Sequence, residues 1–503
     1  MATVLPAGVT ESSLDGAVQG FVDALGSDAV LTSAEDLVEF RDPYDFKGSD
    51  EYTPSAVVVP TTVEEVQAVV RIANEFKVPL WTFGQGRNNA YGGPAPRVRG
   101  SVIVNLREMN RVLEVNDELA YAVVEPGVRF FDLFDHLQAG GHKLWPSIPD
   151  LGWGSVVGNT LDCGRGYTPY GDHPSTQCGL EVVLPNGELL RTGMGGMSNS
   201  KSWNAYQWSY GPSHAGLFFQ SNFGIVTKMG VWLMPQPEVY LSGWAKWEDD
   251  DSVGPLIDTL RDLMLEGIIR NFPLIAQGLG TAEGAAIIGE PGWGLRFAVY
   301  GRQGLVDAHY EVAREALSAI PGVEVGQRTY KWDDRAQAEN HNDKVQGGVP
   351  GMELMDAFKE PYGEDTGHLD LSPVVPLVGA DVVDSIRLLR AAYERHGFPY
   401  LAGLLVLPRS LLHITTLFFD IKDEEQTRHA YETYKSLVVE LAEAGYPIYR
   451  TNLQAMDQVA DTFDFNDHAQ RRLNELLKDT LDPNGILSPG KQGIWPRSMR
   501  RAH

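Results

Sequence analysis

A strand–helix–strand unit near the N-terminal end, which delivers a glycine-rich loop, constrains the fold of this chain more than any other feature. Residues 56–59 form a β-rich run, and the capping-box pair Thr62 and Glu65 then predicts a helix. A second β-rich run, 80–83, leads directly into the loop 84–89. The unit predicts an α/β layer that presents this loop at the end of a strand.

The loop itself begins like a dinucleotide-binding fingerprint. Gly84 and Gly86 match the pattern, but Asn89 occupies the place of its third glycine, so a Rossmann fold is a weak interpretation. The loop still offers backbone N–H groups and the side chain of Arg87, which suit a pyrophosphate. An ordinary glycine-rich turn explains the loop equally well.

The rest of the first half contains more strands. One is predicted at 102–106, and a hairpin is predicted at 180–184 and 188–191 because Asn186 and Gly187 are the strongest short-range hairpin signal. These strands extend the layered unit.

The pattern changes after Pro235, and a chain of 503 residues is too long for one compact core. Longer amphipathic helices are predicted at 307–320, 381–396 and 424–444. We therefore expect a second domain there. The turn-rich stretch 482–491 is expected to fold back on the first domain.

Charge and composition exclude several classes of protein. The chain has 41 basic and 67 acidic residues, a net charge of −26, and such a surface repels nucleic acid. It has no signal-peptide pattern and no apolar run of about 18 residues, so we expect a cytoplasmic protein rather than a membrane protein. Cys163 and Cys178 are the two cysteines. They form neither a disulfide framework nor a metal site, and both are predicted to be buried thiols.

Several ordered motifs resemble one flavoprotein family. They are GRNNAYGG at 86–93, PDLGWGSVVGN at 149–159, GYTPYGDH at 166–173, IYRT at 448–451, DPNG at 482–485 and PGK at 489–491. In these runs the chain resembles the vanillyl-alcohol oxidase and para-cresol methylhydroxylase family, particularly its bacterial eugenol oxidase and 4-alkylphenol oxidase branch. The motifs spread over most of the chain, so chance agreement is implausible.

The resemblance implies an α+β fold. It places a two-subdomain FAD-binding domain at residues 1–236, completed by 450–503, and an α+β substrate (cap) domain at 237–449. The change of pattern after Pro235 agrees with the first boundary.

The resemblance also implies an FAD site. Its cofactor-binding residues would be Gly86, Arg87, Asn88, Asn89, Ser155, Gly158, Asn159, Gly224 and Lys491. His368 matches the histidine that many members join covalently to the flavin, a link that raises the flavin potential, although an arbitrary histidine is more often a core residue. The prototype's second, activating histidine is absent, and the nearest stretch reads Asp42-Pro43-Tyr44-Asp45.

The catalytic residues implied by the resemblance are Tyr91, Asp150, Tyr167, Tyr449 and Arg450. Tyr91, Tyr449 and Arg450 would bind a phenol as its phenolate, because donors that converge on one oxygen favour the anion. Asp150 would lie beside flavin N5 and activate water. A structural hydrogen-bond network and a turn after Pro149 are the alternative explanations for these residues.

The implied function is an FAD-dependent oxidase of para-substituted phenols. Hydride would pass from the benzylic carbon to flavin N5, giving a para-quinone methide, and dioxygen would reoxidise the flavin to give hydrogen peroxide. Three alternatives remain: a dehydrogenase that passes electrons to a cytochrome, a flavin oxidase of aliphatic 2-hydroxy acids, and a flavin-binding protein without catalysis.

The family motifs indicate the class of substrate, while cavity residues and loop length bear on the preferred substrate and the assembly. Ser372, Gly403 and Leu405 are expected to line the cavity, and Gly403 would leave room for a ring substituent. His413 matches a histidine near the family's cavity but could equally be a core residue. Vanillyl alcohol, eugenol and 4-alkylphenols all remain possible substrates. The segment 193–203 is short where the octameric prototype is longer, so we expect a homodimer.

Overall fold

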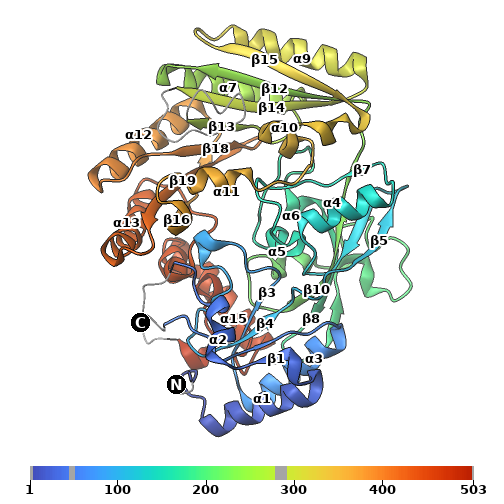
Figure 1. Ribbon diagram of the computed structural model, residues 1–503, viewed down its shortest axis with the longest axis vertical. Helices are drawn as coiled ribbons and strands as arrows, with labels where there is room; N and C mark the ends of the chain where they lie inside the picture. The colour runs from blue at the N-terminus through green and yellow to red at the C-terminus, as the bar shows by residue number, and fades with distance from the viewer. Residues whose placement is uncertain (1–3, 45–50, 278–291, 501–503) are drawn as a thin grey trace.

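The computed structural model describes residues 4–44, 51–277 and 292–500. Over these residues the architecture is α+β, with a four-stranded and a five-stranded sheet in the lower part of the molecule and an eight-stranded sheet in the upper part (Figure 1). A further, two-stranded sheet pairs β7 (Leu144–Trp145) with β11 (Met234–Pro235). None of the described helices is long and apolar enough to cross a bilayer.

The first sheet contains the predicted strand–helix–strand unit. Its strand order is β1 (Val30–Leu31), β2 (Ala56–Val58), β4 (Val102–Asn105) and β3 (Leu80–Phe83), with β2, β4 and β3 parallel. Between β2 and β3, helix α3 (Val63–Phe76) begins at a complete capping box, in which Thr62 and Glu65 satisfy each other's backbone N–H groups. The prediction of this unit is confirmed.

The second sheet lies beside the first and includes the predicted hairpin. Its strand order is β5 (Val112–Asn116), β6 (Tyr121–Val124), β10 (Ile225–Trp232), β8 (Gln177–Val183) and β9 (Leu189–Arg191). Strands β8 and β9 pair antiparallel, and Gly187 has a φ of +83° in the turn between them. The hairpin is therefore confirmed, with a glycine where the turn requires a positive φ.

The third sheet forms the upper part of the molecule (Figure 1). Its strand order is β15 (Glu324–Lys331), β12 (Val239–Trp247), β14 (Trp293–Gly301), β13 (Leu274–Gln277), β18 (Ala402–Val406), β19 (Ser410–Asp420) and β16 (Thr366–Leu371), and β17 (Val374–Pro376) also pairs with β19. Its helices are α7 (Val253–Leu265), α9 (Gln303–Ser318), α12 (Gly379–Arg395) and α13 (Glu424–Glu443). The three helices predicted after Pro235 correspond to α9, α12 and α13. The domain boundaries at 236 and 450 stay a prediction.

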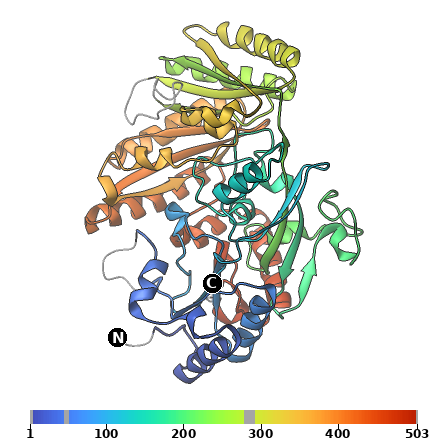
Figure 2. The same ribbon diagram turned by 45° about the vertical axis from the view of Figure 1, so that its right-hand side comes forward.

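The C-terminal stretch returns to the first sheet, next to the N-terminal elements (Figure 2). Leu80 of β3 donates its backbone N–H to Ile486 at 2.7 Å. The fully buried Lys478, near the end of α15 (Phe465–Leu481), pairs with the buried Asp482 at 2.8 Å and donates to the carbonyl of Leu487 at 2.6 Å. A buried ion pair requires such additional hydrogen bonds, and here they hold the returning segment in place.

Three single-residue predictions have different outcomes. Cys178 is buried as predicted, whereas Cys163 is only partly buried, and both are free thiols. His413 is a core residue with hydrogen-bond partners in Ser385, at 2.9 Å, and Tyr400, at 2.8 Å. Burial lowers the pKa of His413 to about 3, so this histidine is neutral and structural.

Candidate active site

One cavity of about 780 Å³ lies where the glycine-rich loop meets the third sheet, a size typical of ligand sites. Every catalytic and cofactor-binding residue expected from the sequence lines it, from Gly86 to Lys491. Ser372, Gly403 and Leu405 line it too, whereas His413 is not among the lining residues. The fold thus brings together segments that lie more than 400 positions apart in the chain.

The loop after β3 can exist only with glycine at two positions. A Cβ on Gly84 would lie 2.5 Å from the carbonyl oxygen of Pro126, and Gly86 has a φ of +64°. Ser155 packs against Gly84 of this loop, and its hydroxyl donates to the carbonyl of Pro126 at 2.6 Å and accepts from the backbone N–H of Gly158 at 2.8 Å. Close packing at Gly84 and the positive φ of Gly86 therefore favour glycine at both positions of the loop.

This end of the cavity fits an anionic dinucleotide. A Cβ on Gly154 would meet no atom within 4 Å, so the missing side chain leaves the cavity open there. Arg87 stacks over the ring of Trp153 at 5.7 Å, and Lys491 lies 3.7 Å from Asp162. Backbone N–H groups and cations are the donors that a pyrophosphate needs, and glycines leave room for it to approach them.

Two of the expected cofactor residues also have structural roles. Asn159 Oδ1 lies 2.6 Å from His173 Nδ1, so this end of the amide is engaged within the wall. A Cβ on Gly224 would lie 2.5 Å from Val182, so glycine is required there by close packing of the chain.

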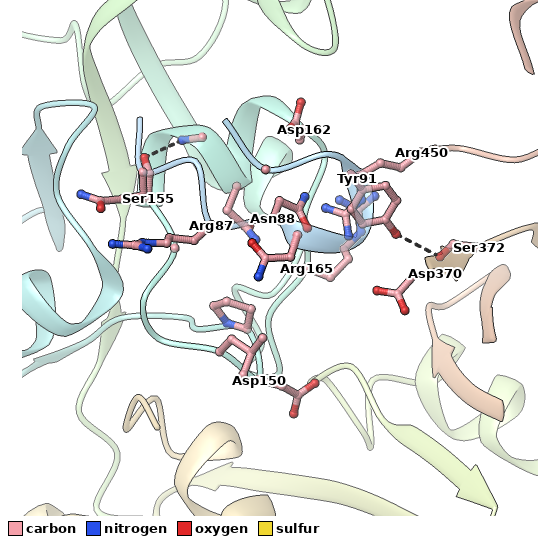
Figure 3. A pocket seen from close by; sticks show the side chains of 18 of the residues that line it. Arg87, Asn88, Tyr91, Asp150, Ser155, Asp162, Arg165, Asp370, Ser372 and Arg450 are labelled. Carbon is pink, nitrogen blue, oxygen red and sulfur yellow. Dashed lines mark hydrogen bonds between the residues drawn. The ribbon is translucent and has the colours of Figure 1, made fainter. Parts of the chain in front are cut away.

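The three residues expected to bind a phenolate meet at one end of the cavity. The Arg450 guanidinium lies 4.5 Å from the ring centre of Tyr91 and 5.5 Å from that of Tyr449. The Tyr91 hydroxyl lies 3.5 Å from the hydroxyl of Ser372 (Figure 3). This end therefore combines two phenol groups with a guanidinium.

The charges at this end suit an anion. Burial raises the pKa of Tyr91 more than Arg450 lowers it, so the phenol keeps its proton. Burial by itself would lower the pKa of Arg450, but neighbours including Tyr449 raise it by more than burial lowers it. The guanidinium therefore stays charged. Its buried Nε has no hydrogen-bond partner in the described part of the chain. An anionic oxygen would supply one.

Asp150 lies in another part of the cavity wall, away from Tyr91 and Arg450 (Figure 3). Its Oδ1 accepts a bond from Arg296 at 2.7 Å and lies 3.0 Å from His341 Nε2, while Tyr167 donates to Oδ2. Burial by itself would raise the pKa of Asp150, but Arg296 and His341 lower it well below its usual range. The carboxylate is therefore ionised and held in place on both oxygens.

Three lining residues were missed by sequence reasoning. Arg296 is the single charged residue of the apolar strand β14, and that exception was a usable signal. His341 begins the short polar helix α10 (His341–Gln346), where nothing in the local pattern distinguishes it. Asp370 follows His368 by two residues, and strand alternation places both on one face.

His368 lies on β16 and is buried, with a ring-centre distance of 4.9 Å to Phe358. Its Nδ1 lies 2.6 Å from the hydroxyl of Tyr44. Burial lowers the pKa of His368, so the imidazole is neutral near pH 7. Tyr44 thus contacts His368 from the stretch that lacks the second histidine. Asp45 lies outside the described residues.

Comparisons with known proteins agree with this geometry. An FAD binding domain family matches residues 54–193. The 4-cresol dehydrogenase [hydroxylating] flavoprotein subunit of Pseudomonas putida is 35% identical, over 98% of both chains. The structure of 4-ethylphenol oxidase from Gulosibacter chungangensis, in complex with isoeugenol, matches with a TM-score of 0.92 and 36% identity, over 99% of this chain and 100% of that one. A structure of p-cresol methylhydroxylase with substrate bound matches with a TM-score of 0.91 and 33% identity, over 98% and 99% of the two chains.

Proposed function

Because this chain is an FAD-dependent oxidoreductase that belongs to the vanillyl-alcohol oxidase and para-cresol methylhydroxylase flavoprotein family, we propose that it oxidises para-alkylphenols at the benzylic carbon. The observation that carries the proposal is a single cavity with Arg450 and two tyrosines at one end and the ionised Asp150 elsewhere in its wall. An aliphatic 2-hydroxy acid has no phenolic oxygen that Arg450 and the two tyrosines could bind.

Each residue group has a task in this proposal. Tyr91, Tyr449 and Arg450 bind the substrate as phenolate, since all three donate to the anion. Bound FAD supplies the acceptor for the hydride that leaves the benzylic carbon. The phenolate electrons then form a para-quinone methide of the substrate. Asp150, which lines the same cavity, orients the water that adds to this electron-poor carbon, giving a 4-hydroxybenzylic alcohol.

We propose dioxygen as the electron acceptor, and expect one dioxygen consumed and one peroxide formed per turnover without added dye. An oxygen electrode with a peroxide assay on a 4-alkylphenol measures both. The competing acceptor is a cytochrome, since one relative is a dehydrogenase flavoprotein subunit. Reduced enzyme that persists for minutes in air-saturated buffer would favour that alternative.

We also propose that His368 carries the flavin covalently. Its neutral imidazole is nucleophilic and faces the cavity, which supports the proposal. Denatured wild type should keep its yellow colour and in-gel fluorescence, and His368→Ala should release FAD. Tyr44→Phe removes only the hydroxyl that contacts His368 and should slow formation of the link. Flavin that separates freely from acid-precipitated wild type would contradict the proposal.

A homodimer and a cytoplasmic location stay predictions. The exposed side chains of Tyr206, Trp208 and Tyr210 are consistent with a surface that another chain covers.

A further inference from the structure

Asp370 contributes a carboxylate to the cavity, and this carboxylate has no role in the proposed reaction. His368, Asp370 and Ser372 alternate along β16 and just beyond it, and all three line the cavity. Figure 3 shows Asp370 beside Ser372, on the side of the cavity that holds Tyr91 and Arg450. The carboxylate therefore lies nearer to the phenol-binding end than Asp150 does.

The protein only partly satisfies this carboxylate. Thr416, its register partner on β19, donates to Oδ1 at 2.9 Å. Among the described residues, no lysine, arginine or histidine forms an ion pair with Asp370. An ionised carboxylate has about four acceptor positions, and leaving them unmet in a cavity that a ligand closes is costly. A ligand that fits this cavity should thus donate to Asp370.

The position of Asp370 indicates which part of the ligand donates. The hydroxyl of Ser372 lies 3.5 Å from that of Tyr91, at the phenol-binding end. Alternate residues of a strand are about 7 Å apart, so Asp370 is within reach of the ring edge next to the phenolic oxygen. A phenolate there would also be repelled by the carboxylate unless a proton donor lies between them.

We propose that Asp370 accepts a hydrogen bond from a second ring hydroxyl, ortho to the phenolic one, so that the preferred substrates are 4-alkylcatechols. This inference rests on the proposed function, because it assumes that Arg450 and its tyrosines hold the phenolate. A methoxy group at the same ring position has lone pairs but no proton to donate. The carboxylate therefore disfavours 2-methoxyphenols even where the cavity has room for them.

Binding titrations test the proposal without turnover. The ligands are catechol, phenol and 2-methoxyphenol, which lack an oxidisable para-alkyl carbon, and the signal is the flavin absorbance of the loaded enzyme. Wild type should bind catechol about tenfold or more tighter than phenol, the scale of a hydrogen bond to a charged group, and 2-methoxyphenol more weakly than phenol. Asp370→Asn should reduce the catechol preference to about twofold or less.

Thr416→Val provides a second variant, which keeps the carboxylate but removes the hydroxyl that donates to it. It should weaken the catechol preference less than Asp370→Asn does, and it covers the case in which Asp370→Asn does not fold. Equal affinity of wild type for catechol and phenol would overturn the inference. So would an Asp370→Asn enzyme that loses affinity for all three ligands equally, because that result indicates a structural role.

The same titrations separate this inference from the proposed function. Wild type that binds none of the three ligands would contradict phenol binding itself. Wild type that binds phenol without preferring catechol would leave phenol binding intact and contradict only the role of Asp370. In turnover, kcat/KM should be higher for 4-ethylcatechol than for 4-ethylphenol, and lowest for 2-methoxy-4-ethylphenol.

Discussion

Replacing Arg450 with alanine should lower kcat/KM for 4-alkylphenols by about 10²–10³-fold, the scale for removing one preorganised donor to a developing charge. The guanidinium is buried and stays charged between Tyr91 and Tyr449. Without it, the phenolic oxygen keeps its proton and cannot push electrons toward the para carbon. Tyr91→Phe and Tyr449→Phe should each cost less, because the remaining donors still hold the oxygen.

The measurement for Arg450→Ala is anaerobic flavin reduction, followed in a stopped-flow instrument. Arg387→Ala is the matched control, because Arg387 forms an exposed ion pair with Asp384 on α12; it should change the rate little. Para-methoxy analogues, whose oxygen cannot ionise, should not be oxidised by the wild type. Normal turnover of phenols by Arg450→Ala would show that this site is wrongly assigned.

A pH titration of a bound inhibitor shows in which direction the site shifts the pKa of a phenol. Donors and a cation that favour the anion lower the pKa of a bound phenol, and one pKa unit corresponds to about 1.4 kcal/mol. A para-substituted phenol that is neutral in solution at pH 7 should therefore show phenolate absorbance when bound to wild type. In Arg450→Ala it should titrate closer to its solution pKa. A bound inhibitor that stays neutral well above pH 7 in wild type contradicts the assignment.

Asp150→Asn should slow flavin reduction by about 10²–10³-fold, because a neutral amide cannot stabilise the electron-poor benzylic carbon. The substitution keeps the shape of the side chain but leaves Arg296 without its counter-charge. The thermal unfolding temperature and the flavin content of the variant should therefore be measured together with the rate, since an unpaired buried charge destabilises the fold. Asp150→Glu, which retains the charge, should keep more activity than Asp150→Asn.

Isotopic labelling tests the second task of Asp150, the orientation of water. Oxidation of a 4-alkylphenol in ¹⁸O-labelled water should place the label in the alcohol product. Label that arrives from dioxygen instead would exclude water addition to a quinone methide.

Much of the fold could be predicted because its signals are local. The capping box of Thr62 and Glu65 begins α3, and Asn186-Gly187 forms the turn of a hairpin. Such elements depend on residues a few positions apart, so the pattern alone determines them. The site residues expected from family motifs also line one cavity.

The contacts around those residues could not be predicted in this way. Asp150 is ionised and oriented because Arg296 and His341 reach it from elements about 150 and 190 positions away. Tyr44 contacts His368 across more than 300 positions. These pairings arise because the fold brings distant segments of the chain together, which no local periodicity encodes.

The sequence by itself therefore determined the local elements, the family and the residues expected to hold the cofactor and phenol. Only the tertiary structure decided which charges those residues carry and which neighbours hold them. It also decided that His413 is a core residue and that Asp370 is a cavity carboxylate. The physical reason is that burial and the approach of distant charges set protonation and hydrogen bonding, and both exist only once the chain has folded.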